Sequence, residues 1–262
     1  MQRIMALVRS HAQVRHVFGG ALSENRLHLE TLAEMELETR AATLLVAHTS
    51  LLLGRDELEH GRGASEAESA ILRLLTPICK LYTAKQGMFV ASEGIEALGG
   101  VGYLETSSMP RYFRDMQVAP VWEGTTNVLS LDIWRALSKE RSLSVFLDDV
   151  KKRVAAAFAS GPLVGANEKE LRSLIDSACD SIVASARKCE GDARLLETSA
   201  RHFAFALARV FISSLFLEHA AFTREAADVE CAVRWARRPL GALLLDSFDA
   251  KHQNLSKLIA KL

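Results

Sequence analysis

Apolar side chains recur at steps of three and four residues through most of the chain. Between positions 22 and 53 they include Leu29, Leu32, Leu37, Ala41 and Leu45. This spacing places an apolar stripe along one face of a helix. Alternating runs of β-branched residues and Asn-Gly hairpin turns, which would indicate strands, are nearly absent. The pattern therefore predicts an all-α protein.

A series of helices follows from this periodicity. After an opening helix, the predicted helices cover residues 23–54, 66–98, 124–138, 142–159, 167–188, 193–222 and 225–260. Ser23 is the expected N-cap of the first of these and Gly54 its end. Pro77 predicts a kink or an early break in the helix that contains it, because proline removes a helical hydrogen bond.

Three segments are predicted to lie outside regular helices. Residues 55–65 form a polar linker, and the loop 160–166 is a candidate boundary. Residues 99–122 are expected to form a long irregular connection, a kind of segment that is disproportionately functional. Pro239-Leu240-Gly241 is expected to interrupt the last helix.

Composition limits the possible partners. The chain has 262 residues, of which 49% are apolar, and its 32 Lys and Arg residues balance 32 Asp and Glu. This balance gives no reason to expect nucleic acid or an anionic membrane as a partner. The apolar stretches 41–54 and 203–222 contain His48, Arg209 and Glu218. They are predicted to be buried core helices rather than membrane spans.

The cysteines and histidines show no metal-binding or redox spacing. Cys79, Cys179, Cys189 and Cys231 form no CxxC pair, so we expect reduced thiols in an intracellular compartment. The eight histidines share no ligand spacing, and no metal site is predicted.

The first 23 residues contain three arginines and no acid, which is either a mitochondrial transit composition or an ordinary helix end. Mitochondrial and cytoplasmic locations both stay open.

Candidate chemistry concentrates between residues 96 and 125. Gly99 and Gly100 allow the backbone to approach a ligand closely. Arg114-Asp115 is expected to form a buried pair that holds the loop. Glu123 lies at a predicted helix start, where it is either a positioned base or an acid favoured by the helix dipole. Free N–H groups at Gly124 suit an anion or a carbonyl oxygen, with simple capping as the alternative.

Five motifs occur in one order along residues 10–140. They are Arg15-His16-Val17-Phe18-Gly19, Leu32-Ala33-Glu34-Met35, the turn from Gly99 to Tyr103, Arg114-Asp115 and Glu123-Gly124-Thr125. Together they resemble the C-terminal helical domain of the flavin-dependent acyl-CoA dehydrogenases. That family combines an R-x-x-F-G loop, an L-A-x-M helix, a G-G-x-G-Y/F turn, an R-D pair and a Y/W-E-G-T helix start.

Several departures resemble the AidB-like branch of this family. Trp122 replaces the usual tyrosine, Glu96 and Asn127 replace glutamines, and helical sequence continues over 141–262. The resemblance implies an up-and-down helical bundle over 1–140 and a helical extension over 141–262 packed on it. The N-terminal helical and β-barrel domains of the family have no counterpart in the sequence. A fragment, a truncated product and one subunit of a split enzyme all stay open.

The resemblance also implies roles for individual residues. FAD is the implied cofactor and an acyl-CoA thioester the substrate. Glu123 would remove the proton α to the thioester carbonyl, and Trp122 and Gly124 would adjoin the substrate. The implied FAD contacts, in part across a subunit boundary, are Arg15, Phe18, Arg26, Glu96, Gly99, Gly100, Thr125 and Asn127. Arginine suits a pyrophosphate, whereas Glu96 would repel one unless it faces the ribose hydroxyls.

The implied activity is α,β-dehydrogenation of an acyl-CoA, an oxidoreductase reaction of fatty-acid metabolism, by a homodimer or homotetramer. As a C-terminal portion, the chain could be inactive alone. The alternative is a non-catalytic helical module for oligomerisation, or for lipid or DNA interaction by analogy with the AidB-like branch. Nucleic acid is not an expected partner, because a solvated helix face explains the basic groups 151–153 and 234–238.

Overall fold

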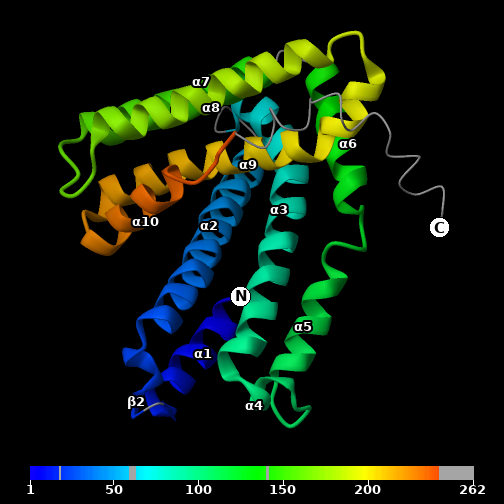
Figure 1. Cartoon of the computed structure of the whole chain (residues 1–262). Coiled ribbons are helices and arrows are strands. Elements are labelled where there is room, and N and C mark those ends of the chain that lie inside the picture. The colour runs from blue at the N-terminus through cyan, green and yellow to red at the C-terminus, as the bar shows by residue number, and fades with distance from the viewer. Residues whose placement is uncertain (18, 59–62, 140–141, 242–262) are drawn as a thin grey trace. The chain divides into compact units, whose positions relative to one another are not determined.

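The computed structural model consists almost entirely of helices (Figure 1). Its described residues are 1–17, 19–58, 63–139 and 142–241. Within them, ten α-helices, one 3-10 helix and two strands of two residues follow one another along the chain. The all-α prediction is confirmed.

The chain divides into two compact units. The first combines Met1–Gly54 with Cys79–Thr126, and the second combines Arg55–Ile78 with Asn127–Leu262. Helices α2 (Arg26–Asp56) and α3 (Glu66–Leu98) each contribute residues to both units. The units therefore divide the chain at other positions than the boundary predicted at residue 140, which remains a prediction.

The first unit is built around the apolar stripe of helix α1 (Gln2–Val14). This stripe, which includes Ile4, Met5 and Val8, is buried against Met35 of α2 and Val90 of α3. Burial of such side chains contributes roughly 1.5–3 kcal/mol each, so α1 is held by packing rather than by helix propensity.

Short elements complete the first unit. A small antiparallel hairpin, β1 (His16–Val17) and β2 (Gly20–Ala21), pairs His16 with Ala21. The 3-10 helix η1 (Leu22–Glu24) leads from the hairpin into α2. After α3 come α4 (Gly100–Tyr103) and α5 (Met109–Val118).

Helix α9 (Ala193–Thr223) is the centre of the second unit. It packs against α7 (Ser142–Ala159), α8 (Glu168–Cys189) and α10 (Ala226–Ala236). Aromatic rings fill these contacts, with centroid distances of 5.0 Å for Phe146–Phe211 and 5.5 Å for Phe216–Trp235. Helix α6 (Thr126–Lys139) joins this core through Trp134, whose ring lies 4.3 Å from that of Phe203.

Among the described residues, α9 is the single helix whose length and composition would allow it to cross a membrane. In its most apolar window, 78% of the residues are buried inside the protein. Buried apolar helices at the centre of a helical core pass the same test of length and composition.

Some predicted helix ends differ from the structure. Helix α2 begins at Arg26, because Asn25 rather than Ser23 supplies the cap: its Oδ1 accepts from the His28 amide at 3.0 Å. The helix continues past Gly54 to Asp56. The sequence predicts a kink or an early break at Pro77. The early break is wrong, since α3 runs through this residue while its neighbours Leu75 and Ile78 are fully buried, and the kink stays a prediction.

The structure also corrects the predicted connection 99–122 and shows part of the last predicted helix. The connection 99–122 is not irregular throughout, because it contains α4 and the ten-residue helix α5, whose first turn carries Pro110. Of the helix predicted over 225–260, the structure shows α10 to Ala236, and residues 242–260 lie outside the described part of the chain.

All four cysteines are free thiols. Within the described ranges, no group of three or more His, Cys, Asp and Glu side chains could hold a metal ion.

Candidate functional site

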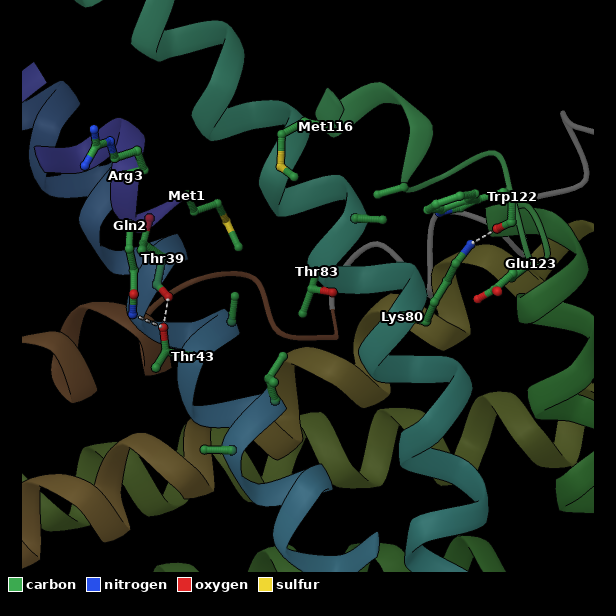
Figure 2. Close-up of a pocket in the computed structure, with 15 residues that line it drawn as sticks. Met1, Gln2, Arg3, Thr39, Thr43, Lys80, Thr83, Met116, Trp122 and Glu123 are labelled. Atoms are coloured by element: carbon green, nitrogen blue, oxygen red, sulfur yellow. Dashed lines mark hydrogen bonds between the residues drawn. The ribbon is translucent and has the colours of Figure 1, made fainter. Parts of the chain in front are cut away.

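A cavity of about 750 Å³ lies in the first unit, between α2, α3 and the segment that follows α5 (Figure 2). Glu123 and Trp122 are among the residues that line it. The other lining residues come from the start of the chain, α2, α3 and the segment 116–119: Met1, Gln2, Arg3, Thr39, Ala42, Thr43, Val46, Ala47, Lys80, Thr83, Ala84, Met116 and Ala119.

The threonine hydroxyls in the walls of this cavity are already hydrogen-bonded. Three lining threonines each donate to a carbonyl one turn earlier in their own helix: Thr39 to Met35 and Thr43 to Thr39, both at 2.8 Å, and Thr83 to Cys79 at 2.7 Å. Because their protons are used within the helices, the parts of the walls that these threonines form suit an apolar group better than a polar one.

Glu123 lies in a turn before α6 rather than in the helix itself, which begins at Thr126. Its φ of 52° is left-handed, and Gly124 follows with a φ of 103°. For a residue other than glycine this conformation costs about 1–2 kcal/mol. The amide of Trp122, just before the turn, donates to the Val118 carbonyl at the end of α5 at 3.2 Å. The side chains of Trp122 and Glu123 are exposed at the cavity.

Lys80 of α3 holds this turn from the other side. Its ammonium donates to the carbonyl oxygen of Trp122 at 2.8 Å and also to that of Gly124. Figure 2 shows the lysine side chain pointing from α3 toward the carbonyl of Trp122.

Reasoning from the sequence missed Lys80. A signal was nevertheless present, because Lys80 is the one charged residue between Arg73 and Lys85 in the long apolar helix. A charge in such a run indicates a specific partner.

The predicted flavin residues lie elsewhere in the first unit. Arg15 follows α1, Arg26 is the first residue of α2, and Glu96 precedes the Gly99-Gly100 turn at the end of α3. All five of these residues are exposed. The hairpin strand β2 and helix α4, which flank these residues in sequence, lie toward the same end of the unit in Figure 1. Among the described residues, none of these five lines the cavity. Phe18 lies outside the described residues.

The turn at Gly99 and Gly100 is open enough to admit a phosphate group of a ligand. Gly99 has a φ of 64° with ψ of −148°, a conformation essentially restricted to glycine. A Cβ built on Gly99 or on Gly100 would meet no atom within 4 Å. Guanidinium groups suit phosphates by charge and geometry, and those of Arg15 and Arg26 are exposed.

Thr125 and Asn127 flank the start of α6. Thr125 is exposed. The side-chain oxygen of Asn127 accepts from Arg201 of α9 at 3.2 Å, both residues belonging to the second unit. The predicted flavin residue Asn127 is thus engaged by the helical segment beyond residue 140.

The expected buried pair of Arg114 and Asp115 is wrong. Arg114 instead forms a two-bond ion pair with Glu105, at 2.8 and 3.1 Å, and both side chains are exposed. Asp115 faces Arg111 one turn earlier in α5, at 3.6 Å. Adjacent residues of a helix point in different directions, so the two side chains find separate partners. The Arg114 guanidinium holds the pKa of Glu105 below its usual range.

Two family models match the chain. The model described as "Acyl-CoA dehydrogenase, C-terminal domain" matches residues 1–138. The model described as "Acyl-CoA dehydrogenase 11 C-terminal domain-like" matches residues 141–259.

Curated relatives agree with these models. The chain is 40% identical over 245 residues to acyl-CoA dehydrogenase family member 11 of Caenorhabditis elegans, covering 90% of this chain and 38% of the relative. It is 36% identical over 149 residues to AidB of Escherichia coli, covering 57% of this chain and 26% of AidB. The chain thus spans less than half the length of these relatives.

Solved structures share the fold. C. elegans ACDH-11, crystallised in complex with C11-CoA, matches with a TM-score of 0.88 at 34% identity, over 99% of this chain and 44% of that one. An FAD-complexed acyl-CoA dehydrogenase of Bacillus anthracis matches over 99% of this chain and 48% of its own with a TM-score of 0.73; at 15% identity, this likeness shows the fold alone. The chain belongs to the acyl-CoA dehydrogenase family, and the part of the family that it matches is the C-terminal helical portion.

Proposed function

We propose that this chain supplies the catalytic base and part of the FAD site of an acyl-CoA dehydrogenase. The observation that carries the proposal is Glu123, a carboxylate placed by a left-handed turn at a cavity lined mainly by apolar side chains and by threonines whose hydroxyls are bonded within their helices. An acyl chain would occupy such a cavity, and the carboxylate would take the proton α to the thioester carbonyl. When bound, FAD supplies the acceptor for the hydride that leaves the β-carbon.

The substrate class draws support from the relatives. ACDH-11 of C. elegans was crystallised with C11-CoA, and an acyl-CoA is the corresponding proposal for this chain. Trp122 and Gly124 on either side of Glu123 would adjoin the thioester. Trp122 is 64% exposed, so it presents its indole to whatever enters the cavity.

We assign the predicted flavin residues that lie outside the cavity to the pyrophosphate and adenosine end of FAD. Arg15, Arg26, Glu96, Gly99 and Gly100 do not line the cavity at Glu123, and we place them in the other half of a site shared between subunits. The two arginines would hold the pyrophosphate and the glycines would admit the adenosine end. On this proposal Thr125 and Asn127 also contact the cofactor, and the protein is a dimer or tetramer.

The test is a substitution of Glu123 by glutamine in purified protein that carries these residues, supplied with FAD and an acyl-CoA. Loss of the base predicts turnover lower by about 10²–10⁴-fold with flavin binding retained. Glu93→Gln is the matched control, a carboxylate on α3 that does not line the cavity. Equal turnover in Glu123→Gln and the parent protein would overturn the assignment of the base.

One observation favours a non-catalytic module as the second candidate. Large apolar side chains of the first unit are exposed, including Leu27 and Tyr103, each at 80%, and Leu104 at 54%. An apolar patch on a surface marks a contact site, and this candidate assigns these side chains to one. A preparation that remains colourless throughout an FAD titration, yet is oligomeric by sedimentation, would favour this candidate over the flavoprotein.

A further inference from the structure

The turn that carries Glu123 is anchored by one side chain from a distant part of the chain. Lys80 lies 42 residues before Trp122 in sequence, yet its ammonium donates to the Trp122 carbonyl at 2.8 Å and to the Gly124 carbonyl. Lys80 and Glu123 both line the cavity. A lysine ammonium has three N–H donors, and two of them serve the backbone of this one turn.

These two carbonyls belong to the residues immediately before and after Glu123. The Trp122 carbonyl lies in the peptide plane just before the Cα of Glu123, and the Gly124 carbonyl lies in the plane just after the Cα of Gly124. Holding both planes restricts the two-residue turn between them, and with it the direction in which the Glu123 carboxylate leaves the backbone. Glu123 and Gly124 both have positive φ, so the turn adopts an unfavourable conformation that an outside contact must maintain.

We propose that Lys80 is a positioning residue, which fixes the backbone on both sides of Glu123 and keeps its carboxylate at the cavity. This inference rests on the proposed function of Glu123 as the base. Lys80 acts through its hydrogen bonds to the turn. Misplacement of a catalytic group by about 1 Å lowers rates by about 100-fold, so the role has a measurable kinetic signature.

The first measurement needs no cofactor. In the Lys80→Met variant, hydrogen–deuterium exchange at the amides of residues 122–126 should rise, because the turn loses its anchor. Lys85→Met is the matched control, a lysine of the same helix that does not line the cavity, and exchange in this segment should match the parent protein. Unchanged exchange in Lys80→Met would overturn the proposal.

The second measurement is the turnover of flavin-loaded protein. Lys80→Met and Lys80→Gln should lower kcat by about 10–100-fold while KM and flavin content change by less than about threefold. A loss that falls on KM alone, or on flavin content alone, would contradict a positioning role.

Chemical rescue separates hydrogen bonding from charge. Propylammonium added to Lys80→Ala restores a donor group where the lysine was truncated and should recover part of the lost kcat. Tetramethylammonium is a cation with no N–H group and should recover none. Equal rescue by both ions would overturn the hydrogen-bond mechanism.

The Glu123→Gln variant distinguishes failure of this inference from failure of the proposed function. If Glu123→Gln retains turnover, the base assignment is wrong whatever Lys80 does. If Glu123→Gln loses turnover while Lys80→Met keeps its kcat, the base assignment stands and the role of Lys80 is wrong.

Discussion

Glu123 combines an unfavourable backbone conformation with a position at a cavity. Among the described residues, the non-glycine positions with positive φ are Glu123 and Arg224. Arg224 ends α9, where a left-handed residue is a common helix terminator, and its guanidinium donates to the Pro162 carbonyl at 3.3 Å. Glu123 follows no regular helix end of that kind. A strained residue at a cavity supports a functional hypothesis, and here the strain falls on the residue that the family motif singles out.

Cys179 on α8 predicts a dependence of stability on pH. The residue is 1% exposed, and burial raises the pKa of its thiol to about 12 from 9.0. In the unfolded chain the thiol ionises near pH 9, while in the native protein it stays protonated until about pH 12. The unfolded state therefore binds fewer protons in this window, and the free energy of unfolding should fall as pH rises from 9 toward 12.

The measurement is the free energy of unfolding by denaturant at several pH values above 9, for the parent protein and for Cys179→Ala. The parent should lose up to about 1.4 kcal/mol more per pH unit than the variant. Below pH 9 the difference between the two proteins should not vary with pH. Parallel curves across the alkaline range would show that Cys179 does not carry this effect.

At the scale of elements, α4 can fold back on α3 because of one glycine. Gly102 is buried, and a Cβ there would lie 2.2 Å from the carbonyl oxygen of Ile95 in the last turns of α3. Backbone cannot yield as a flexible side chain does. Gly102→Ala should therefore lower the free energy of unfolding by about 1–3 kcal/mol.

Gly100→Ala is the matched control within the same short helix. A Cβ at Gly100 meets no atom within 4 Å, so the free energy of unfolding should change by about 0.5 kcal/mol or less. Thermal or denaturant unfolding of both variants checks the prediction. Equal effects of the two substitutions would mean that the close approach to Ile95 does not determine the packing of α4.

The sequence predicts helices better than it predicts their ends or their partners. Apolar periodicity located α7, α8 and α9 to within one residue at each end. Helices α7 and α8 each bury one face, and α9 is buried on every side over residues 210–217. The early break expected at Pro77 failed because a proline costs about 3 kcal/mol, less than the burial of several neighbouring apolar side chains contributes. The expected pair of Arg114 and Asp115 failed because side-chain partners depend on tertiary structure.

In the candidate site, too, local features could be predicted from the sequence and long-range contacts could not. The glycines and Glu123 are local signals, because backbone conformation and a sequence motif are both read over a few residues. The contact from Lys80 to the turn joins residues 42 and 44 positions apart. Periodicity carries no information about such a contact, and even the isolated charge in an apolar helix could indicate only that some partner exists.

At the scale of the whole molecule, the second unit extends across residues 138–141, where one family model ends and the other begins. The models match residues 1–138 and 141–259, yet α6 shares a core with the helices that follow it. Trp134 is 9% exposed, with its ring 4.3 Å from that of Phe203. Asn127 accepts from Arg201. Family boundaries follow sequence relationships, whereas a folding unit follows burial, and here the two differ.

A chain that ends at residue 140 should therefore fail to fold as an independent bundle. It would retain α6 and the 66–78 portion of α3 but lose α7 to α10, which form the rest of that unit. Trp134 would lose Phe203, and exposure of one such buried aromatic side chain costs about 1.5–3 kcal/mol, a large share of the 5–15 kcal/mol that stabilises a typical domain. Circular dichroism on heating should show a broad transition for residues 1–140 and a sharp one for the full chain. A sharp, cooperative transition for residues 1–140 at the temperature of the full chain would instead make residue 140 a true domain boundary.

The substitution Phe203→Ala in the full chain is the milder test of the same contact, and it should lower the free energy of unfolding by about 3–5 kcal/mol.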